Sequence, residues 1–176
     1  MGEIMREVYK DGAISEDRWQ RPEAEAAVDP AVHSLIPLQR FLLEREALAE
    51  PLETGHLGVI LGAGDDPLAL QDVLTLLPIV ALDFPSFADG RSFSSAHILR
   101  ETLGFKGELR AVGPFILDQI GFMQRCGIDS FALDNPRLKP ALVAGNLNEV
   151  TVYTQPVTTR AEEAPSNRPW LRQAQV

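Results

Sequence analysis

Residues 57–83 read LGVILGAGDDPLALQDVLTLLPIVALD and contain one complete strand–helix–strand unit. The apolar runs Leu57–Leu61 and 79–82 are short and are bounded by Gly, Asp and Pro residues, which is typical of buried strands. Pro67 stands in the first turn of the segment between them, where proline is tolerated, so residues 67–77 are predicted to form a helix. The unit therefore predicts two parallel strands joined by a helical crossover.

The same alternation continues toward the C-terminus. Short strands alternating with helices are typical of βαβ units around a parallel sheet. We expect an α/β fold with a mainly parallel sheet of about five strands, either a flavodoxin-like open sheet or a partial barrel. The further predicted strands are Glu108–Val112, 128–133 and 149–153, and the further predicted helices are 92–103, 114–126 and 136–144.

The two ends of the chain differ from this pattern. Residues 1–30 predict a hairpin around the Asp11-Gly12 turn, followed by a linker rich in Glu, Ala and Pro. From Ser34 the apolar residues recur at helical spacing, so a helix is predicted there. The α/β domain is expected over residues 31–156, and residues 157–176, rich in polar residues, predict a mobile tail.

Composition and charge argue against a nucleic-acid-binding protein, a membrane protein and a disulfide-bonded protein. The chain has 176 residues, 45% of them hydrophobic, and a formal net charge of −9. This charge argues against non-specific binding of nucleic acid or of an anionic membrane. No apolar run reaches the length that spans a bilayer, and no signal segment opens the sequence, so a cytoplasmic protein is expected. The single cysteine, Cys126, excludes an internal disulfide and a cysteine-ligated cluster.

The loop after the second strand is the richest in chemistry. It reads Asp-Phe-Pro-Ser-Phe-Ala-Asp-Gly-Arg-Ser over residues 83–92 and ends at a predicted helix start. Gly90, Arg91 and Ser92 could bind an oxyanion, because a helix start offers free N–H groups and Arg adds a fixed cation. Asp83 and Asp89 could orient Arg91 or carry a proton. The alternative is structural: Ser92 caps the helix and Arg91 forms a surface ion pair.

Arg110 is the last charged residue of the third predicted strand, Glu108–Val112. It is predicted to point toward the same edge as the loop after Asp83 and to make a second anion contact. The alternative is an ion pair with Glu108 or another acidic neighbour at the surface.

The predicted helix 114–126 carries three further candidates, Asp118, Gln119 and Arg125. Gln119 falls within the apolar arc, where its amide must find hydrogen bonds, either from the backbone or from a ligand. Asp118 and Arg125 share the edge of that arc and could both meet a third group. Cys126 also lies on this arc, and a buried thiol is usually inert.

The sequence indicates no resident cofactor and no metal site. His33, His56 and His97 lack metal-ligand spacing. Gly62 and Gly64 resemble a nucleotide-binding turn, but two acidic residues follow them and the third glycine is missing.

Three runs of residues resemble a bacterial family known as domain of unknown function 934. They are VALDFPSFADGRSFS from Val80, GELRAVG from Gly107 and DQIGFMQRCGIDSF from Asp118. The resemblance covers roughly residues 35–155. It implies that the family pattern includes Asp89, Gly90, Arg91, Arg110, Asp118, Gln119, Arg125 and Asp129. Pro114 departs from it, because relatives tend to carry an acidic residue there.

The resemblance implies a pathway, since such proteins are typically encoded beside the sulfite or nitrite reductase haemoprotein of assimilatory sulfate reduction. Some carry the label of probable oxidoreductase. We expect an accessory protein that binds a small oxyanion or docks on the sulfite reductase haemoprotein. The alternatives are an enzyme acting on a small anionic substrate, with Asp83 or Asp89 as proton carrier and Arg91 and Arg110 as clamps, and an interaction module without a ligand.

Overall fold

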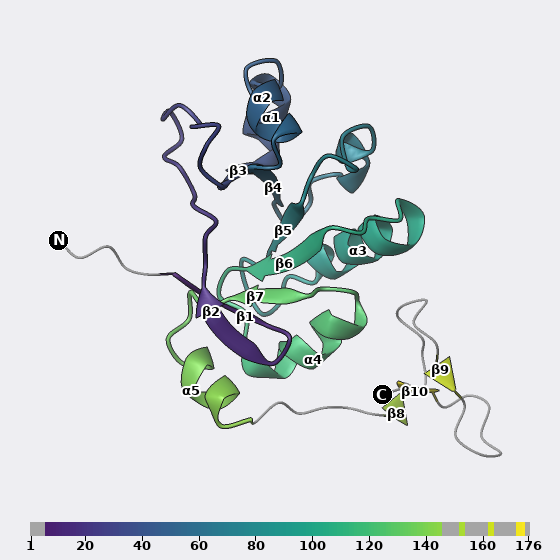
Figure 1. Ribbon diagram of the computed structural model, residues 1–176. Helices are drawn as coiled ribbons and strands as arrows, with labels where there is room; N and C mark the ends of the chain where they lie inside the picture. The colour runs from purple at the N-terminus through teal and green to yellow at the C-terminus, as the bar shows by residue number, and fades with distance from the viewer. Residues whose placement is uncertain (1–5, 146–151, 154–161, 164–171, 175–176) are drawn as a thin grey trace.

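The structure is a computed structural model that describes residues 6–145 and the short strands at 152–153, 162–163 and 172–174 (Figure 1). It confirms the predicted α/β class. The main sheet of this described part has seven strands in the order β2-β1-β7-β6-β5-β4-β3. They are β1 (Glu7–Lys10), β2 (Ala13–Glu16), β3 (Ser34–Pro37), β4 (Leu57–Leu61), β5 (Ile79–Asp83), β6 (Glu108–Val112) and β7 (Ser130–Ala132).

Strands β3 to β7 are parallel and lie in the order of the chain. Right-handed crossovers between neighbouring parallel strands put every connection on the same face of a sheet. This order differs from the 2-1-3-4-5 order of flavodoxin-like sheets. Of the two predicted alternatives, the partial barrel describes the structure.

The helices cover one face, because each contributes buried side chains to a single hydrophobic cluster with Val59, Val80, Leu109 and Phe131 of the strands. The apolar face of each amphipathic helix packs against this side of the sheet, where its side chains are shielded from water. The helices are α1 (Leu38–Leu43), α2 (Ala49–Glu53), the 3-10 turn η1 (Pro67–Leu70), α3 (Arg91–His97), the π-helical turn η2 (Ile98–Thr102), α4 (Leu117–Arg125) and α5 (Leu138–Val143).

The structure corrects three element predictions. Ser34 begins the strand β3, not a helix, and the helix starts only at Leu38. The predicted helix 67–77 is a single 3-10 turn, Pro67–Leu70, followed by hydrogen-bonded turns over residues 71–76. The predicted strand 149–153 is not in the main sheet: its described part, β8 (Val152–Tyr153), pairs antiparallel with β10 (Arg172–Ala174).

The N-terminal hairpin is confirmed, with Asp11 and Gly12 both at positive φ (50° and 79°) in its turn. Such a turn matches the twist of the two strands it joins. Strand β1 also pairs antiparallel with β7, so the hairpin extends the main sheet.

Residues 17–20 run directly from β2 to the opposite edge of the sheet, where Gln20 forms a parallel bridge with Ser34 of β3. An extended chain covers at most about 14 Å between Glu16 and Gln20. Seven flat strands would span about 29 Å. The sheet is therefore curved, and we call residues 17–20 the strap, because they cross its inner face, the face opposite the helices.

A small antiparallel sheet of order β8-β10-β9, with β9 at Glu162–Glu163, lies near the C-terminus. The predicted mobile tail over 157–176 falls mostly on residues outside the described ranges and stays a prediction. Across the described residues, no helix combines the length and the apolar character needed to cross a membrane.

Candidate functional site

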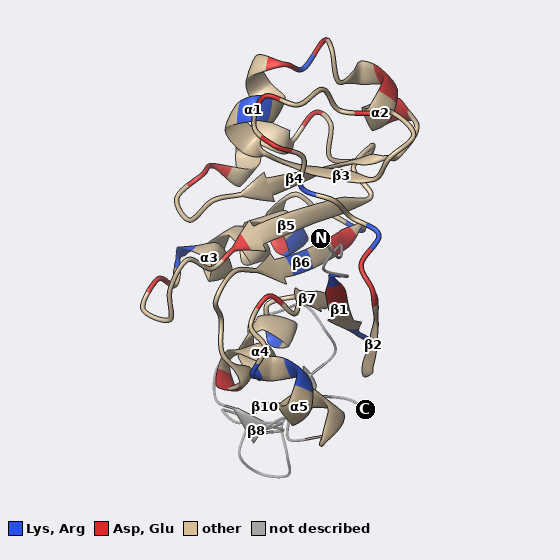
Figure 2. Cartoon of the chain, turned by 90° about the vertical axis from the view of Figure 1, so that its left-hand side faces the viewer, with Lys and Arg blue, Asp and Glu red and all other residues tan. Residues whose placement is uncertain are grey.

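The loops at the carboxyl edge of the sheet are joined by side-chain contacts, and ligands of parallel sheets bind at this edge. Figure 2 shows the loops after β4 and β5 projecting on the same side, with acidic residues in both. Gln39, after β3, donates to Asp65, after β4, at 3.4 Å. Nη1 of Arg91, after β5, lies so close to Gly64 that a side chain there would meet it at 2.7 Å. Loops after three consecutive strands thus form one surface.

Asp83 is the last residue of β5 and points toward the inner face, as Ile79 and Ala81 do. Burial raises the pKa of its carboxyl group, Arg21 opposes the shift and Asp89 adds to it. Gly113, at positive φ (102°), packs against it: a Cβ there would lie 2.9 Å from Asp83 Oδ1. Asp83 is the candidate at this edge whose environment suits a proton carrier.

Arg91 forms an ion pair with Asp89 inside its own loop. Nε donates to Oδ1 at 3.0 Å and Nη2 to Oδ2 at 2.6 Å, which is the bidentate geometry of a strong pair. The hydrogen bonds from Arg91 lower the pKa of Asp89 to about 2. Asp89 is therefore ionised at neutral pH and holds Arg91, so it is poorly suited to the predicted role of proton carrier.

The start of α3 departs from the predicted oxyanion cradle. Its N-cap is Gly90, and Asp89 accepts the backbone N–H of Arg91 at 3.2 Å. Ser92 is buried and donates its hydroxyl to the backbone carbonyl of Asp83. The structural alternative of Ser92 as N-cap is therefore wrong, while the surface ion pair of Arg91 is confirmed.

Arg110 lies on the inner face within a buried polar cluster. Its Nη1 donates to Asp17 of the strap at 2.6 Å and its Nη2 to Glu108 at 2.7 Å. Lys10 of the hairpin donates to the second oxygen of Glu108 at 2.8 Å, and the Ser130 hydroxyl donates to the first at 2.6 Å. The charges of the two cations, Lys10 and Arg110, and of the two carboxylates, Asp17 and Glu108, cancel within this cluster.

The cluster sits at the far end of the strands from Arg91, because Glu108 and Ser130 are the first residues of β6 and β7. Arg110 therefore does not join Arg91 at one rim as predicted. Its ion pair with Glu108 was the alternative, but the pair is buried between sheet and strap rather than at the surface. Burial raises the pKa of Glu108, but the charge of Arg110 and hydrogen bonds from Lys10, Ser130 and Arg110 outweigh it and lower the pKa to about 2.

The three candidates on α4 lie on the helix-covered side of the sheet. Gln119 is buried, and its Oε1 accepts the backbone N–H of Ile116 at 3.1 Å, which satisfies a free donor at the helix start. Arg125 donates to the carbonyl of Gly121 and lies over the ring of Phe122. Asp118 is exposed in the first turn. Gln119 thus has the backbone partner predicted as its structural alternative.

Asp129, implied by the family pattern, is structural in this fold. Its carboxylate accepts the backbone N–H of Leu109 at 2.9 Å and pairs with Arg100. Arg100 also donates to the backbone carbonyls of Phe105, Gly107 and Gly127. This arginine ties η2 to the amino ends of β6 and β7.

Sequence reasoning missed Lys10, Asp17, Glu108 and Ser130 as a cluster. One signal was available: Glu108 and Arg110 stand two residues apart in a strand and therefore share a face. It also missed the packing of His33 between Trp19 and His56, with ring centroids 5.0 Å and 4.5 Å apart. Burial, Arg18 and His56 lower the pKa of His33.

Among the described residues, no group of three or more His, Cys, Asp or Glu side chains could hold a metal ion. Burial raises the pKa of the Cys126 thiol to about 11, against a smaller opposing effect of Arg125. This thiol is protonated at neutral pH and is a poor nucleophile.

Residues 58–164 match a family described as "Bacterial protein of unknown function (DUF934)", which is more than half of the chain. No curated protein and no solved structure matches the chain.

Proposed function

The chain belongs to the DUF934 family, and from this premise we propose that it is an accessory protein of assimilatory sulfite reduction that docks on the sulfite reductase haemoprotein. The link to sulfite reduction comes from the family resemblance of its three motifs. The choice of docking over oxyanion binding comes from the geometry of the two arginines.

The observation that carries this choice is that both arginines are already bound by carboxylates of the chain. Arg91 is held by Asp89 through two hydrogen bonds, and Arg110 by Asp17 and Glu108. At Arg110, which is buried, an added sulfite or sulfate would have to displace a carboxylate or create an excess of buried negative charge, which is costly. At Arg91, whose side chain is 63% exposed, the anion would have to compete with the Asp89 carboxylate and with water.

The charge of the chain supports a protein partner of opposite sign. The formal net charge is −9, and complementary charge steers the encounter of two proteins. The sequence offers no thiol pair or dinucleotide fingerprint of its own, so any redox chemistry would belong to the partner.

The test is affinity purification of the tagged chain from cells that grow on sulfate. We expect the haemoprotein to co-purify in stoichiometric amount, and not from cells that grow on cysteine. Calorimetric titration with sulfite, sulfate, adenylylated sulfate and phosphate is expected to show no heat of binding. Binding of one of these anions that disappears in Arg91→Ala, without recovery of the haemoprotein, would replace docking by oxyanion binding.

A second candidate function is favoured by Asp83. Its raised pKa at the carboxyl edge suits an acid–base residue of an enzyme that acts on a small anionic substrate. The test is turnover of sulfite or adenylylated sulfate by the purified chain. Activity that disappears in Asp83→Asn while the fold is kept would support the enzyme.

A further inference from the structure

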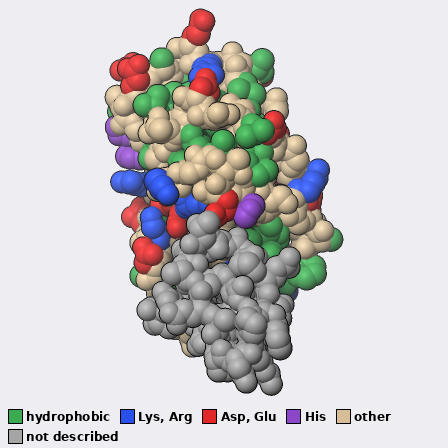
Figure 3. Space-filling model, turned by 90° about the vertical axis from the view of Figure 1, so that its right-hand side faces the viewer, with side chains coloured by type: hydrophobic (Ala, Val, Ile, Leu, Met, Phe, Trp, Pro, Cys, Tyr) green, Lys and Arg blue, Asp and Glu red, His purple; other side chains and the backbone are tan. Residues whose placement is uncertain are grey.

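Exposed large apolar side chains follow three neighbouring strands of the sheet in the loops at its carboxyl edge. Leu68, after β4, is 48% exposed, Phe87, after β5, is 65% exposed, and Ile116, after β6, is 36% exposed. We call these three residues the apolar rim. Hydrophobic side chains also reach the surface on the face drawn in Figure 3, among charged ones.

Contacts between the loops make the three segments that carry the apolar rim neighbours at this edge. Arg91 lies against Gly64 and so joins the loop of Phe87 to the loop of Leu68. Gly113 lies against Asp83 and Phe84 and so joins the loop before Ile116 to that of Phe87. Each rim residue therefore belongs to a loop that touches the next one.

Acidic side chains without an ion pair accompany the rim. Among the described residues, Asp65, Asp66 and Asp83 form no ion pair, whereas both arginines near them are engaged: Arg91 with Asp89 and Arg21 with Asp134. Asp66 is adjacent to the rim, since its carboxylate accepts the backbone N–H of Leu68 at 2.9 Å. The edge thus combines apolar contacts with a local excess of negative charge.

We propose that this edge is the docking surface for a basic protein partner, which inserts apolar contacts against Phe87, Leu68 and Ile116 and places Lys or Arg side chains over Asp65, Asp66 and Asp83. The proposal rests on the proposed function, whose partner it describes. Exposed aromatic residues are the side chains that most often dominate the energy of an interface. Charge complementarity at the same surface sets orientation and the rate of association.

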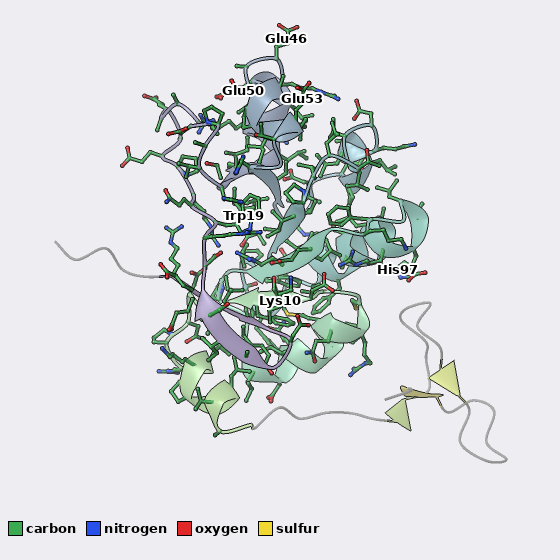
Figure 4. All side chains as sticks on the ribbon, viewed as in Figure 1. Lys10, Trp19, Glu46, Glu50, Glu53 and His97 are labelled. Carbon is green, nitrogen blue, oxygen red and sulfur yellow. The ribbon has the colours of Figure 1, made fainter. Side chains whose placement is uncertain are left out.

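Two sets of variants test the surface against the purified sulfite reductase haemoprotein, with the affinity measured by biolayer interferometry. The apolar variant is Phe87→Ser, and its control is Leu43→Ser, which removes an exposed leucine of α1. The charge variant is Asp65→Asn, Asp66→Asn and Asp83→Asn together, because Asn keeps the capping oxygens. Its control, Glu46→Gln, Glu50→Gln and Glu53→Gln together, removes three exposed acids at the α1–α2 end (Figure 4).

We expect each edge variant to weaken binding by about tenfold or more and each control to leave it unchanged. The wild-type affinity and that of the Phe87→Ser variant are expected to fall as salt increases, whereas the charge variant responds less. Equal binding by the edge variants and the wild type would overturn this surface and leave the proposed function standing. A wild-type chain that does not bind the haemoprotein would overturn both, and circular dichroism of each variant separates loss of binding from loss of fold.

Discussion

Arg110 on β6 donates its Nη1 hydrogen bond to Asp17, 93 residues earlier in the chain, at 2.6 Å. The two side chains are almost completely buried, with exposed fractions of 4% and 7%. Asp17 also accepts the backbone N–H of Trp19 at 3.0 Å. This ion pair therefore fastens the strap, and with it Trp19, over the inner face of the curved sheet.

Removing this carboxylate should be costly to the fold. We expect Asp17→Ala to lower the free energy of unfolding by about 3 kcal/mol, because Arg110 stays charged and buried with one partner fewer. Urea unfolding at pH 7 measures the loss. Glu16→Ala, an exposed neighbour on β2, is expected to change it by about 0.5 kcal/mol or less. Equal losses in the two variants would contradict the role of the strap.

Glu108 makes stability depend on pH in the acid range. Its pKa in the folded protein is about 2, below the ordinary value of 4.5. Its contribution is therefore complete above about pH 4.5 and is lost as the pH falls toward 2. We expect Glu108→Gln to be clearly less stable than the wild type at pH 7, with a difference that narrows between pH 4.5 and pH 3. A difference that stays constant over this window would contradict the assignment.

His33 also makes the folded protein less stable as the pH falls, but at a higher pH than Glu108 does. The pKa of His33 lies below its ordinary value of 6.5, so the unfolded chain binds more protons than the folded chain as the pH falls through that value. We expect the urea midpoint of the wild type to fall between pH 7.5 and pH 5.5, and to fall less in His33→Gln. Because the His33 ring lies against Trp19, fluorescence in a Trp170→Phe background should follow the same titration. An unchanged slope in His33→Gln would contradict it.

A substitution at Gly113 tests the close packing of its backbone against Asp83 and Phe84. An alanine there would keep a positive φ of 102° and bring its Cβ within 2.6 Å of the Phe84 carbonyl oxygen. Gly104, at φ 65°, is a matched control, because its Cβ would meet no atom within 4 Å. We expect Gly104→Ala to cost about 1 kcal/mol from backbone strain and Gly113→Ala clearly more. Thermal unfolding compares them, and equal losses would contradict the close approach.

The sequence predicted the central strands well because they are buried on both faces and therefore read as continuous apolar runs. Leu57–Leu61 and Glu108–Val112 match the structure at both ends, and β5 extends one residue beyond its prediction. Strand β3 was missed because its four residues lead directly into α1. Leu35 and Ile36, which face opposite sides of the sheet, fit the helical spacing equally well.

The site was harder to predict, because its contacts depend on the curvature of the sheet. The residue types of Asp83, Asp89 and Arg91 showed that their loop is rich in chemistry, and Arg91 does pair within it. The bond between Arg110 and the strap joins distant parts of the chain, and neither periodicity nor spacing reveals such a pair. The exposure of Phe87 was equally hidden, because a loop has no periodicity that shows which of its side chains are buried.

Docking on a protein and binding of an oxyanion are separated by sedimentation velocity of the purified chain mixed with the purified sulfite reductase haemoprotein, at low and at moderate salt. If the chain acts by docking, we expect a complex that sediments faster than either protein and that weakens as salt increases. Two species that sediment independently at both salt concentrations, with the chain folded, would rule out docking on the haemoprotein.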